Sequence, residues 1–299
     1  MSDQHNGHAA PAAGQRGAVT EVGLRRAAVL GSPIAHSLSP ALHGGAYAAL
    51  GLTGWRYDLV ECDEAGLPRF VDSLGPDWVG LSLTMPLKRA VLAIADDVSP
   101  LAIAVGAANT LLLGDRPGRG ARRVENTDVT GLVEALREAG VRRVERAVVL
   151  GAGGTAQGAL AALREFGERS PQVLVRDPAR TADLRAAADR LGVRPVVSGG
   201  LLDAPLPEAD VVISTLPGAA ADAVPAGRWA AGTVVLDVVY APWPTKFAAG
   251  AVAGGCRVVS GLAVLLYQAV AQVELMTGRP GPVEAMRSAL DAAVRARQR

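Results

Sequence analysis

The chain has 299 residues, which at roughly 150 residues per domain predicts two domains. Its formal net charge of +1 gives no indication of a nucleic-acid or acidic-membrane partner. No uncharged apolar run reaches the roughly 18 residues that a transmembrane helix needs. Cys62 and Cys256 lack the spacing of a metal site, which favours two buried thiols in a reducing cytoplasm and no bound metal.

The first half alternates short apolar runs with helical patterns. Residues 1–25 are rich in Gly, Ala and polar side chains and predict a disordered tail without a signal peptide. Strands are then expected at 27–30, 55–60, 79–83 and 110–113, and helices at 40–50 and 87–95. The Gly-, Arg- and Pro-rich stretch 114–123 predicts a turn between two strands. This rhythm predicts an α/β domain with a parallel or mixed sheet.

A second, more regular series follows a helix predicted at 128–139. Its strands are expected at 147–150, 172–175, 195–197, 211–215, 234–238 and 257–259. These runs are rich in Val, Leu and Ile without polar alternation, which is typical of parallel strands covered on both faces. Helices predicted at 262–276 and 282–297 end the chain. We place the main domain boundary near Asp128.

A glycine-rich loop stands between the strand 147–150 and the next helix. Its residues are Gly151, Ala152, Gly153, Gly154, Thr155 and Ala156, which fit the pattern G-x-G-x-x-A. The first glycine allows a tight turn, the second lets the backbone approach a pyrophosphate, and the alanine lets helix and strand pack closely. The free N–H groups at the helix N-terminus favour an anion. The loop therefore predicts a dinucleotide site.

The next strand end bears on which dinucleotide binds. Arg176 and Arg180 could hold a 2′-phosphate as planar donor groups, whereas Asp177 lies where an acid would bind the ribose 2′-hydroxyl. Two arginines against one acid favour NADP and leave NAD possible.

Polar residues also gather at strand ends of the first half. Ser37 and Ser39 are two apart, so in an extended loop both hydroxyls could face one carboxylate, although Ser39 before Pro40 also suits a helix N-cap. Lys88 falls in the first turn of a helix, where the dipole disfavours a cation, so partial burial would let it exchange protons. Asp128 could cap its helix or pair with Lys88. His36 and His43 suggest no triad, and we take them as structural or incidental.

In order and spacing, these segments resemble the shikimate dehydrogenase family across residues 27–278. The matching features are the Ser-x-Ser loop, Thr-x-Pro-x-Lys at 84–88, Gly-Ala-x-Asn-Thr at 106–110, Asn-Thr-Asp at 126–128, the glycine loop, and a late helix that carries Gln268. Ser82 stands where that family usually has Asn, and Val129 replaces a Gly. Val175 and Asp177 replace the Asn and Thr of its cofactor turn.

The resemblance implies a role for each matched residue. Lys88 and Asp128 would form the catalytic pair, and Gly261 would lie at the nicotinamide. The carboxylate of the substrate would be bound by Ser37, Ser39 and Tyr240, and its ring hydroxyls by Thr84, Asn109 and Gln268. Gln272, one helical turn after Gln268, has no matched role, and from its position we expect it only to face solvent.

The resemblance also implies a domain plan and a reaction. An α/β substrate-binding domain with a mixed sheet (26–127 and 261–299) would be joined to a Rossmann-type doubly wound parallel sheet that binds NADP (128–260), with the C-terminal helices returning to the first domain. The reaction would be the reversible NADPH-dependent reduction of 3-dehydroshikimate to shikimate. An NAD-dependent quinate dehydrogenase, a folate dehydrogenase and a non-catalytic ligand sensor remain alternatives. Monomer and homodimer are both open.

Overall fold

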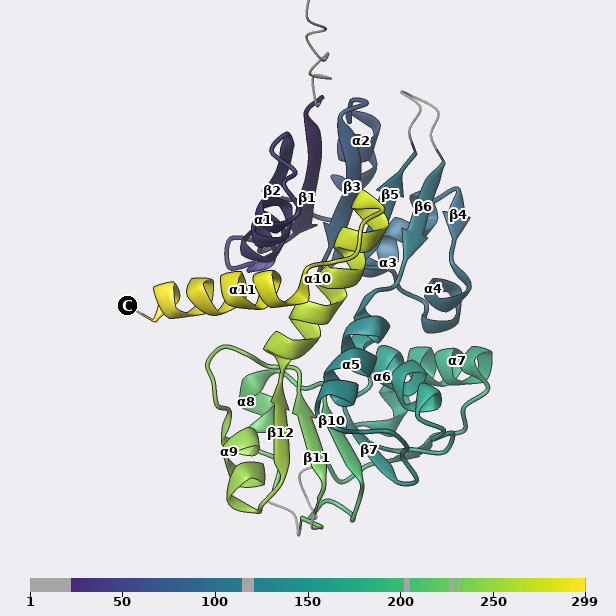
Figure 1. Ribbon diagram of the computed structural model, residues 1–299. Helices are drawn as coiled ribbons and strands as arrows, with labels where there is room; N and C mark the ends of the chain where they lie inside the picture. The colour runs from purple at the N-terminus through teal and green to yellow at the C-terminus, as the bar shows by residue number, and fades with distance from the viewer. Residues whose placement is uncertain (1–22, 115–120, 202–204, 226–228, 231, 299) are drawn as a thin grey trace, which may run out of the picture.

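The computed structural model describes residues 23–114, 121–201, 205–225, 229–230 and 232–298. Two six-stranded sheets lie one above the other in Figure 1, each with its own helices. Of the predicted tail, residues 1–22 lie outside the described part, and Arg25 is already the first residue of strand β1. No helix in the described part is long and apolar enough to cross a bilayer.

The first sheet is mixed, as the strand pattern predicts. Its strand order is β2-β1-β3-β5-β6-β4, with β1 parallel to β2 and β3, and with β5 antiparallel to β3 and β6. The strands are β1 (Arg25–Gly31), β2 (Trp55–Glu61), β3 (Trp78–Leu83), β4 (Asp97–Val98), β5 (Thr110–Leu113) and β6 (Arg122–Glu125). The helices are α1 (Ser39–Ala49), α2 (Leu67–Asp72), α3 (Leu87–Ala90) and α4 (Pro100–Val105).

One predicted helix of this half is wrong in part. The segment 87–95 contains only a short α3, followed by the 3₁₀ helix η1 (Val91–Ile94). Leu87 and Val91 are both fully buried and four residues apart, which accounts for the helical pattern in the sequence. A 3₁₀ turn is a frequent ending for a helix, and hydrophobic periodicity does not distinguish it from a further α-helical turn.

The second sheet is entirely parallel. It has the order β12-β11-β10-β7-β8-β9, so the chain starts in the middle and winds outward in both directions. Its strands are β7 (Ala147–Leu150), β8 (Gln172–Leu174), β9 (Val196–Ser198), β10 (Val211–Ser214), β11 (Val234–Asp237) and β12 (Arg257–Ser260). Helices α6 (Gly154–Glu165), α7 (Ala182–Leu191), α8 (Gly218–Ala221) and α9 (Lys246–Ala253) and the 3₁₀ helix η2 (Pro178–Arg180) connect them.

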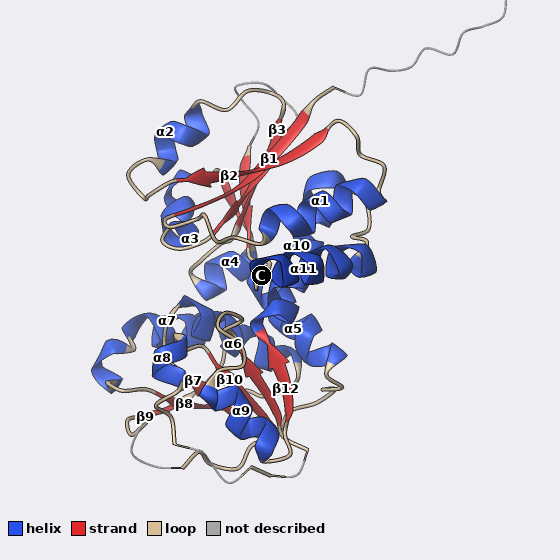
Figure 2. Ribbon diagram, turned by 90° about the vertical axis from the view of Figure 1, so that its left-hand side faces the viewer, coloured by secondary structure: helices blue, strands red, loops and turns tan. Residues whose placement is uncertain are grey.

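Two helices join the two halves, and a third packs on the first half. The α5 helix (Asp128–Glu138) leads into the second sheet, and α10 (Gly261–Thr277) leads back from it and packs against α5, α1, β3 and β5. The last helix, α11 (Val283–Arg297), packs along α1, as Figures 1 and 2 show. Leu42, Leu266, Met286 and Leu290 share one buried cluster. The predicted fold class is confirmed, including the return of the C-terminal helices to the first half.

The two cysteines agree with their prediction as buried thiols. Cys62 and Cys256 are both free and buried, and burial raises the pKa of each thiol. The described residues contain no cluster of three or more His, Cys, Asp or Glu side chains that could hold a metal ion.

Candidate active site

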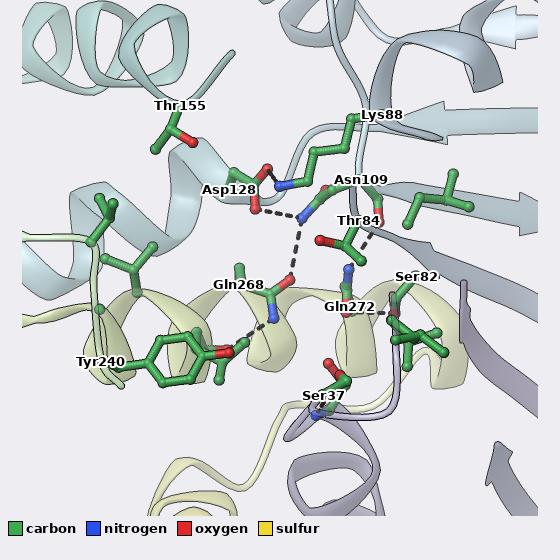
Figure 3. A pocket seen from close by; sticks show the side chains of 18 of the residues that line it. Ser37, Ser82, Thr84, Lys88, Asn109, Asp128, Thr155, Tyr240, Gln268 and Gln272 are labelled. Carbon is green, nitrogen blue, oxygen red and sulfur yellow. Dashed lines mark hydrogen bonds and ion pairs between the residues drawn. The ribbon is translucent and has the colours of Figure 1, made fainter. Parts of the chain in front are cut away.

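A cavity of about 350 Å³ lies where the two sheets face each other. Figure 3 shows its polar side chains pointing toward a common space. The first sheet and its loops, the N-terminus of α6, the end of β11 and the helix α10 all contribute to its wall. The sequence-predicted residues among its lining are Ser37, Ser39, Thr84, Lys88, Asn109, Asp128, Thr155, Tyr240, Gly261 and Gln268.

Lys88 and Asp128 form an ion pair in this cavity. The Nζ of Lys88, in α3, lies 2.6 Å from Oδ2 of Asp128, the first residue of α5. The side chains are 33% and 25% exposed, so both can be reached from the cavity yet are shielded from bulk water. Thr127, not Asp128, is the N-cap residue of α5, and the Asp128 carboxylate is turned toward other side chains instead. The capping alternative for Asp128 therefore does not describe this site.

Asn109 ties the ion pair to α10. Its Nδ2 donates to Oδ1 of Asp128 at 2.9 Å and to Oε1 of Gln268 at 3.2 Å, while its Oδ1 accepts from the Thr127 amide at 2.7 Å. Asn109 is 2% exposed and Gln268 7%. Since each oxygen of Asp128 has its own donor, the carboxylate is held in one orientation, which in turn orients the amine of Lys88.

The loop that carries Ser37 and leads into Ser39 borders the same cavity. The Oγ of Ser37 accepts a hydrogen bond from the Ser39 amide at 3.2 Å, which leaves its hydroxyl hydrogen free to donate to a ligand. Ser39 is the first residue of α1, and Leu38 is its N-cap without a side-chain capping bond. Tyr240 and Thr84 enter the cavity wall from the end of β11 and the end of β3. Hydroxyl donors therefore surround the space in front of Lys88.

The expectation that Gln272 faces solvent is wrong. Gln272 is 1% exposed and lies in the cavity wall beside Ser82. Its Oε1 accepts from the Ser82 hydroxyl at 2.7 Å, and its Nε2 donates to Oγ1 of Thr110 at 3.0 Å. Residues four apart share a helix face, so Gln268 already predicted an inward position for Gln272.

Two further residues that the sequence did not single out for the site contact this pair, the half-buried Tyr57 at Ser82 and the buried His43 at Gln272. Tyr57 donates to the Ser82 hydroxyl at 2.6 Å, and burial raises the Tyr57 pKa. His43 stacks on Tyr57 with ring centroids 3.9 Å apart, and its Nε2 lies 3.4 Å from Oε1 of Gln272. Burial lowers the pKa of His43 to about 3, so the ring is neutral and structural, as expected of His43.

The glycine loop has the geometry of an anion cradle. Gly151 adopts φ +105°, a left-handed conformation that favours glycine. Gly153 is the N-cap of the twelve-residue helix α6 and has no side-chain capping bond, and a Cβ on Gly153 or Gly154 would meet open space. Ala156 is fully buried against the sheet. The residues present therefore fit a dinucleotide, with the α6 N-terminus offering donors to a pyrophosphate.

Arg176 and Arg180 lie outside the cavity lining, at the end of β8 beside this cradle. Both side chains are exposed, as a surface that receives a ligand phosphate requires. Asp177 differs, because its Oδ1 accepts from the Ala179 amide at 2.9 Å and caps η2. That bond turns the carboxylate toward its own backbone and leaves the arginines as the available charges.

Gly261 has a local reason for being glycine that the resemblance did not supply. It begins α10 in the cavity wall, and a Cβ there would overlap the carbonyl oxygen of Val238. The backbone of the β11 end and that of α10 therefore meet at this residue, whatever else lies nearby.

Comparison with known proteins bears on this geometry. Two family models match the chain, the shikimate dehydrogenase substrate binding domain over residues 29–111 and the shikimate 5′-dehydrogenase C-terminal domain over residues 261–290. A shikimate dehydrogenase (NADP⁺) from Moorella thermoacetica is 38% identical over 87% of this chain and 90% of its own length.

Solved structures agree in fold. Shikimate dehydrogenase from Mycobacterium tuberculosis is 43% identical with a TM-score of 0.77, covering 90% of this chain and 99% of that one. Shikimate 5-dehydrogenase from Thermus thermophilus, in complex with NADP(H) and shikimate, is 33% identical with a TM-score of 0.75, covering 90% of this chain and 100% of that one. Identity and coverage at this level exceed a likeness of fold alone, so the chain belongs to the shikimate dehydrogenase family.

Proposed function

We propose that this protein catalyses the reversible NADPH-dependent reduction of 3-dehydroshikimate to shikimate. The observation that carries the proposal is the Lys88–Asp128 ion pair, which lies in a cavity that also contains Thr155 at the N-terminus of α6. A proton-transferring amine and a dinucleotide cradle thus open on the same space. Family membership supports this reaction, since one relative is named shikimate dehydrogenase (NADP⁺) and a similar shikimate 5-dehydrogenase was solved with NADP(H) and shikimate.

Each half of the molecule takes one ligand in this proposal. Residues 26–127 and 261–299 form the substrate-binding catalytic domain, and residues 128–260 form the NADP-binding domain. Gly151, Ala152, Gly153, Gly154, Thr155 and Ala156 hold the pyrophosphate, Arg176 and Arg180 hold the 2′-phosphate, and Gly261 borders the nicotinamide. When bound, NADPH supplies the hydride for the C3 carbonyl carbon of the substrate.

The side chains of the protein transfer the proton and orient the substrate. Lys88 donates a proton from Nζ to the carbonyl oxygen and, in the reverse direction, accepts it from the hydroxyl. Asp128, itself held by Asn109, keeps the amine aimed at that oxygen. Proton transfer of this kind contributes roughly 10²–10⁴-fold to a rate. Ser37, Ser39 and Tyr240 bind the carboxylate, and Thr84, Asn109 and Gln268 bind the ring hydroxyls.

The test is turnover by the purified protein, followed as nicotinamide absorbance, with shikimate or quinate and with NADP⁺ or NAD⁺ in turn. Shikimate with NADP⁺ should have the highest kcat/KM. Faster turnover of quinate with NAD⁺ would identify a quinate dehydrogenase, and ligand binding without turnover would identify a sensor. We place the reaction in the cytoplasm, in keeping with the two buried free thiols.

A further inference from the structure

The loop 32–38, which we name the serine loop, is held by two side chains from elements distant in sequence. Glu61 ends β2, and its Oε1 accepts from the Ser32 hydroxyl at 2.7 Å while its Oε2 accepts from the Ile34 amide at 3.1 Å. Both oxygens of this carboxylate therefore bind the first part of the loop.

Arg297 holds the second part of the loop from the opposite end of the chain. It is the last residue of α11, which packs along α1 (Figure 1). Its Nη1 donates to the carbonyl oxygen of His36 at 2.8 Å and its Nη2 to that of Ser37 at 2.9 Å. A planar guanidinium is suited to two adjacent acceptors, because its donors are fixed relative to each other.

The two contacts act from outside the cavity. His36 and Ser37 line the cavity, but Glu61 and Arg297 are absent from its lining. Arg297 fixes two carbonyl oxygens toward α11, and so keeps their partial negative charge turned to its own side of the loop. The Ser37 hydroxyl, whose oxygen already accepts from the Ser39 amide, then has its hydrogen left for an anionic group.

We propose that Arg297 and Glu61 are positioning residues that preorganise the serine loop to receive the carboxylate of the substrate. This inference rests on the proposed function for the identity of the ligand. The clamp, by which we mean the hydrogen bonds of Glu61 and Arg297 with the serine loop, is a property of the ligand-free protein. Neither side chain touches the reacting atoms. Their loss should therefore weaken substrate binding while the chemical step stays intact, because a loop that must be ordered on binding lowers affinity.

The experiment compares Arg297→Ala with Arg295→Ala in the full chain. Arg295 is exposed on the same helix two residues earlier, and the described residues offer its side chain no hydrogen-bond or ion-pair partner. Arg295→Ala thus removes the same charge without removing the clamp. Arg297→Ala should raise the KM for shikimate by on the order of tenfold and leave kcat and the KM for NADP⁺ within about twofold of wild type.

Two more variants sharpen the result. Arg297→Lys retains the charge but cannot hold two carbonyls in a fixed geometry, so its KM should fall between those of wild type and Arg297→Ala. Glu61→Gln converts one acceptor position into a donor and should raise the KM in the same direction. Thermal unfolding followed by circular dichroism verifies that each variant folds. Equal KM values for Arg297→Ala and Arg295→Ala would overturn the proposal.

Hydrogen exchange separates this proposal from the assigned reaction. In ligand-free protein, the amides of Ile34 and Ser37 should exchange faster in Arg297→Ala than in Arg295→Ala. Unchanged exchange would refute the clamp even if shikimate is turned over. If exchange is faster in Arg297→Ala but the wild-type protein does not turn over shikimate, the assigned reaction is refuted and the clamp is retained. Faster exchange in Arg297→Ala with an unchanged KM for shikimate would show that the clamp has no role in substrate binding.

Discussion

The contacts of Lys88 fix the position of its amine in the cavity. Its amine lies 2.6 Å from Asp128, and Asp128 is held in turn by Asn109. The carboxylate is therefore a partner that orients the amine, and the amine lines the cavity, as the proposed proton transfer requires. Removing the amine should leave the hydroxyl donors of the substrate site in place.

We expect Lys88→Ala to lower kcat by roughly 10²–10⁴-fold while shikimate binding remains nearly unchanged. The measurements are steady-state turnover and calorimetric titration with shikimate. Lys246→Ala is the matched control, since Lys246 is the other lysine of the chain and is exposed at the start of α9. Normal turnover in Lys88→Ala would remove Lys88 from the mechanism.

His43 is a residue whose environment fixes its charge. It is fully buried against Tyr57 and Gln272, and burial lowers its pKa to about 3. In an unfolded chain a histidine titrates near pH 6.5, so between these two values the unfolded state binds a proton that the folded state does not. The contribution of neutral His43 to the free energy of unfolding is therefore complete above the pKa of the unfolded chain and is lost as the pH falls toward the pKa of the folded protein.

The effect of His43 on the pH dependence of stability should be measurable by urea unfolding. Between about pH 7.5 and about pH 5, this residue alone should lower the free energy of unfolding by about 2 kcal/mol. The variant His43→Phe, which can still stack on Tyr57, should lack that part of the pH dependence. The quantity to compare is the change in unfolding free energy between the two pH values. Parallel pH profiles for the two proteins would mean that His43 is protonated in the folded state.

At the scale of elements, the contact of α5 with α10 sets the spacing of the site. Asp128 begins α5 and Gln268 lies in α10, and the helices approach closely at Gly131, where a Cβ would lie 2.6 Å from the Val264 carbonyl oxygen and 3.1 Å from Cβ of Gln268. A larger residue at this point would push apart two helices that both carry site residues. Gly158 of α6 differs, since its Cβ would make ordinary contacts at 3.7 Å with Leu132 and Val129.

These two helical glycines make a matched pair of substitutions. Gly131→Ala should destabilise the protein by about 1–3 kcal/mol through overpacking and should also lower turnover. Gly158→Ala should be neutral or stabilising by up to about 1 kcal/mol, because alanine favours a helix. Urea unfolding and the shikimate assay measure both effects. Equal stability of the two variants would mean that α10 can shift without cost.

At the scale of the whole molecule, the two halves also meet through exposed charges. Arg89, next to Lys88 in α3, lies 2.5 Å from Asp183 in α7 of the other half, and Arg190 donates to the Ala104 carbonyl at 3.1 Å. The Arg89 and Asp183 side chains are 62% and 60% exposed. Water and salt screen a pair this exposed, so we expect it to contribute little to the stability of the contact between the halves.

A double-mutant cycle with Arg89→Ala and Asp183→Ala should give a coupling energy of only about 0.2–1 kcal/mol in unfolding free energy. That coupling should shrink further at high salt. The measurement is urea unfolding of the four proteins at low and high ionic strength. A larger, salt-insensitive coupling would show that the pair is a structural bond between the halves.

Much of the fold was predictable because its signals are local. Most residues of the strands β7 and β10 are Val, Leu or Ile, and the loop after β7 has the glycines that its turn requires. Hydrophobic period and backbone preference depend only on near neighbours in sequence. The same reasoning failed at 91–94, where α-helical and 3₁₀ turns bury the same side chain and the pattern cannot separate them.

The residue types of the site were also readable from the chain, but their arrangement was not. Lys88 and Asp128 are forty residues apart, and Gln272 is buried against Ser82 from the far end of the sequence. The order of the motifs determined the family resemblance and the class of chemistry, since each motif is a short run of residues. Only tertiary packing decided which side chains meet, because α10 and α11 return to the first sheet and bring Gln268, Gln272 and Arg297 to its loops. Such contacts depend on how the whole core packs, and a short stretch of sequence does not determine that packing.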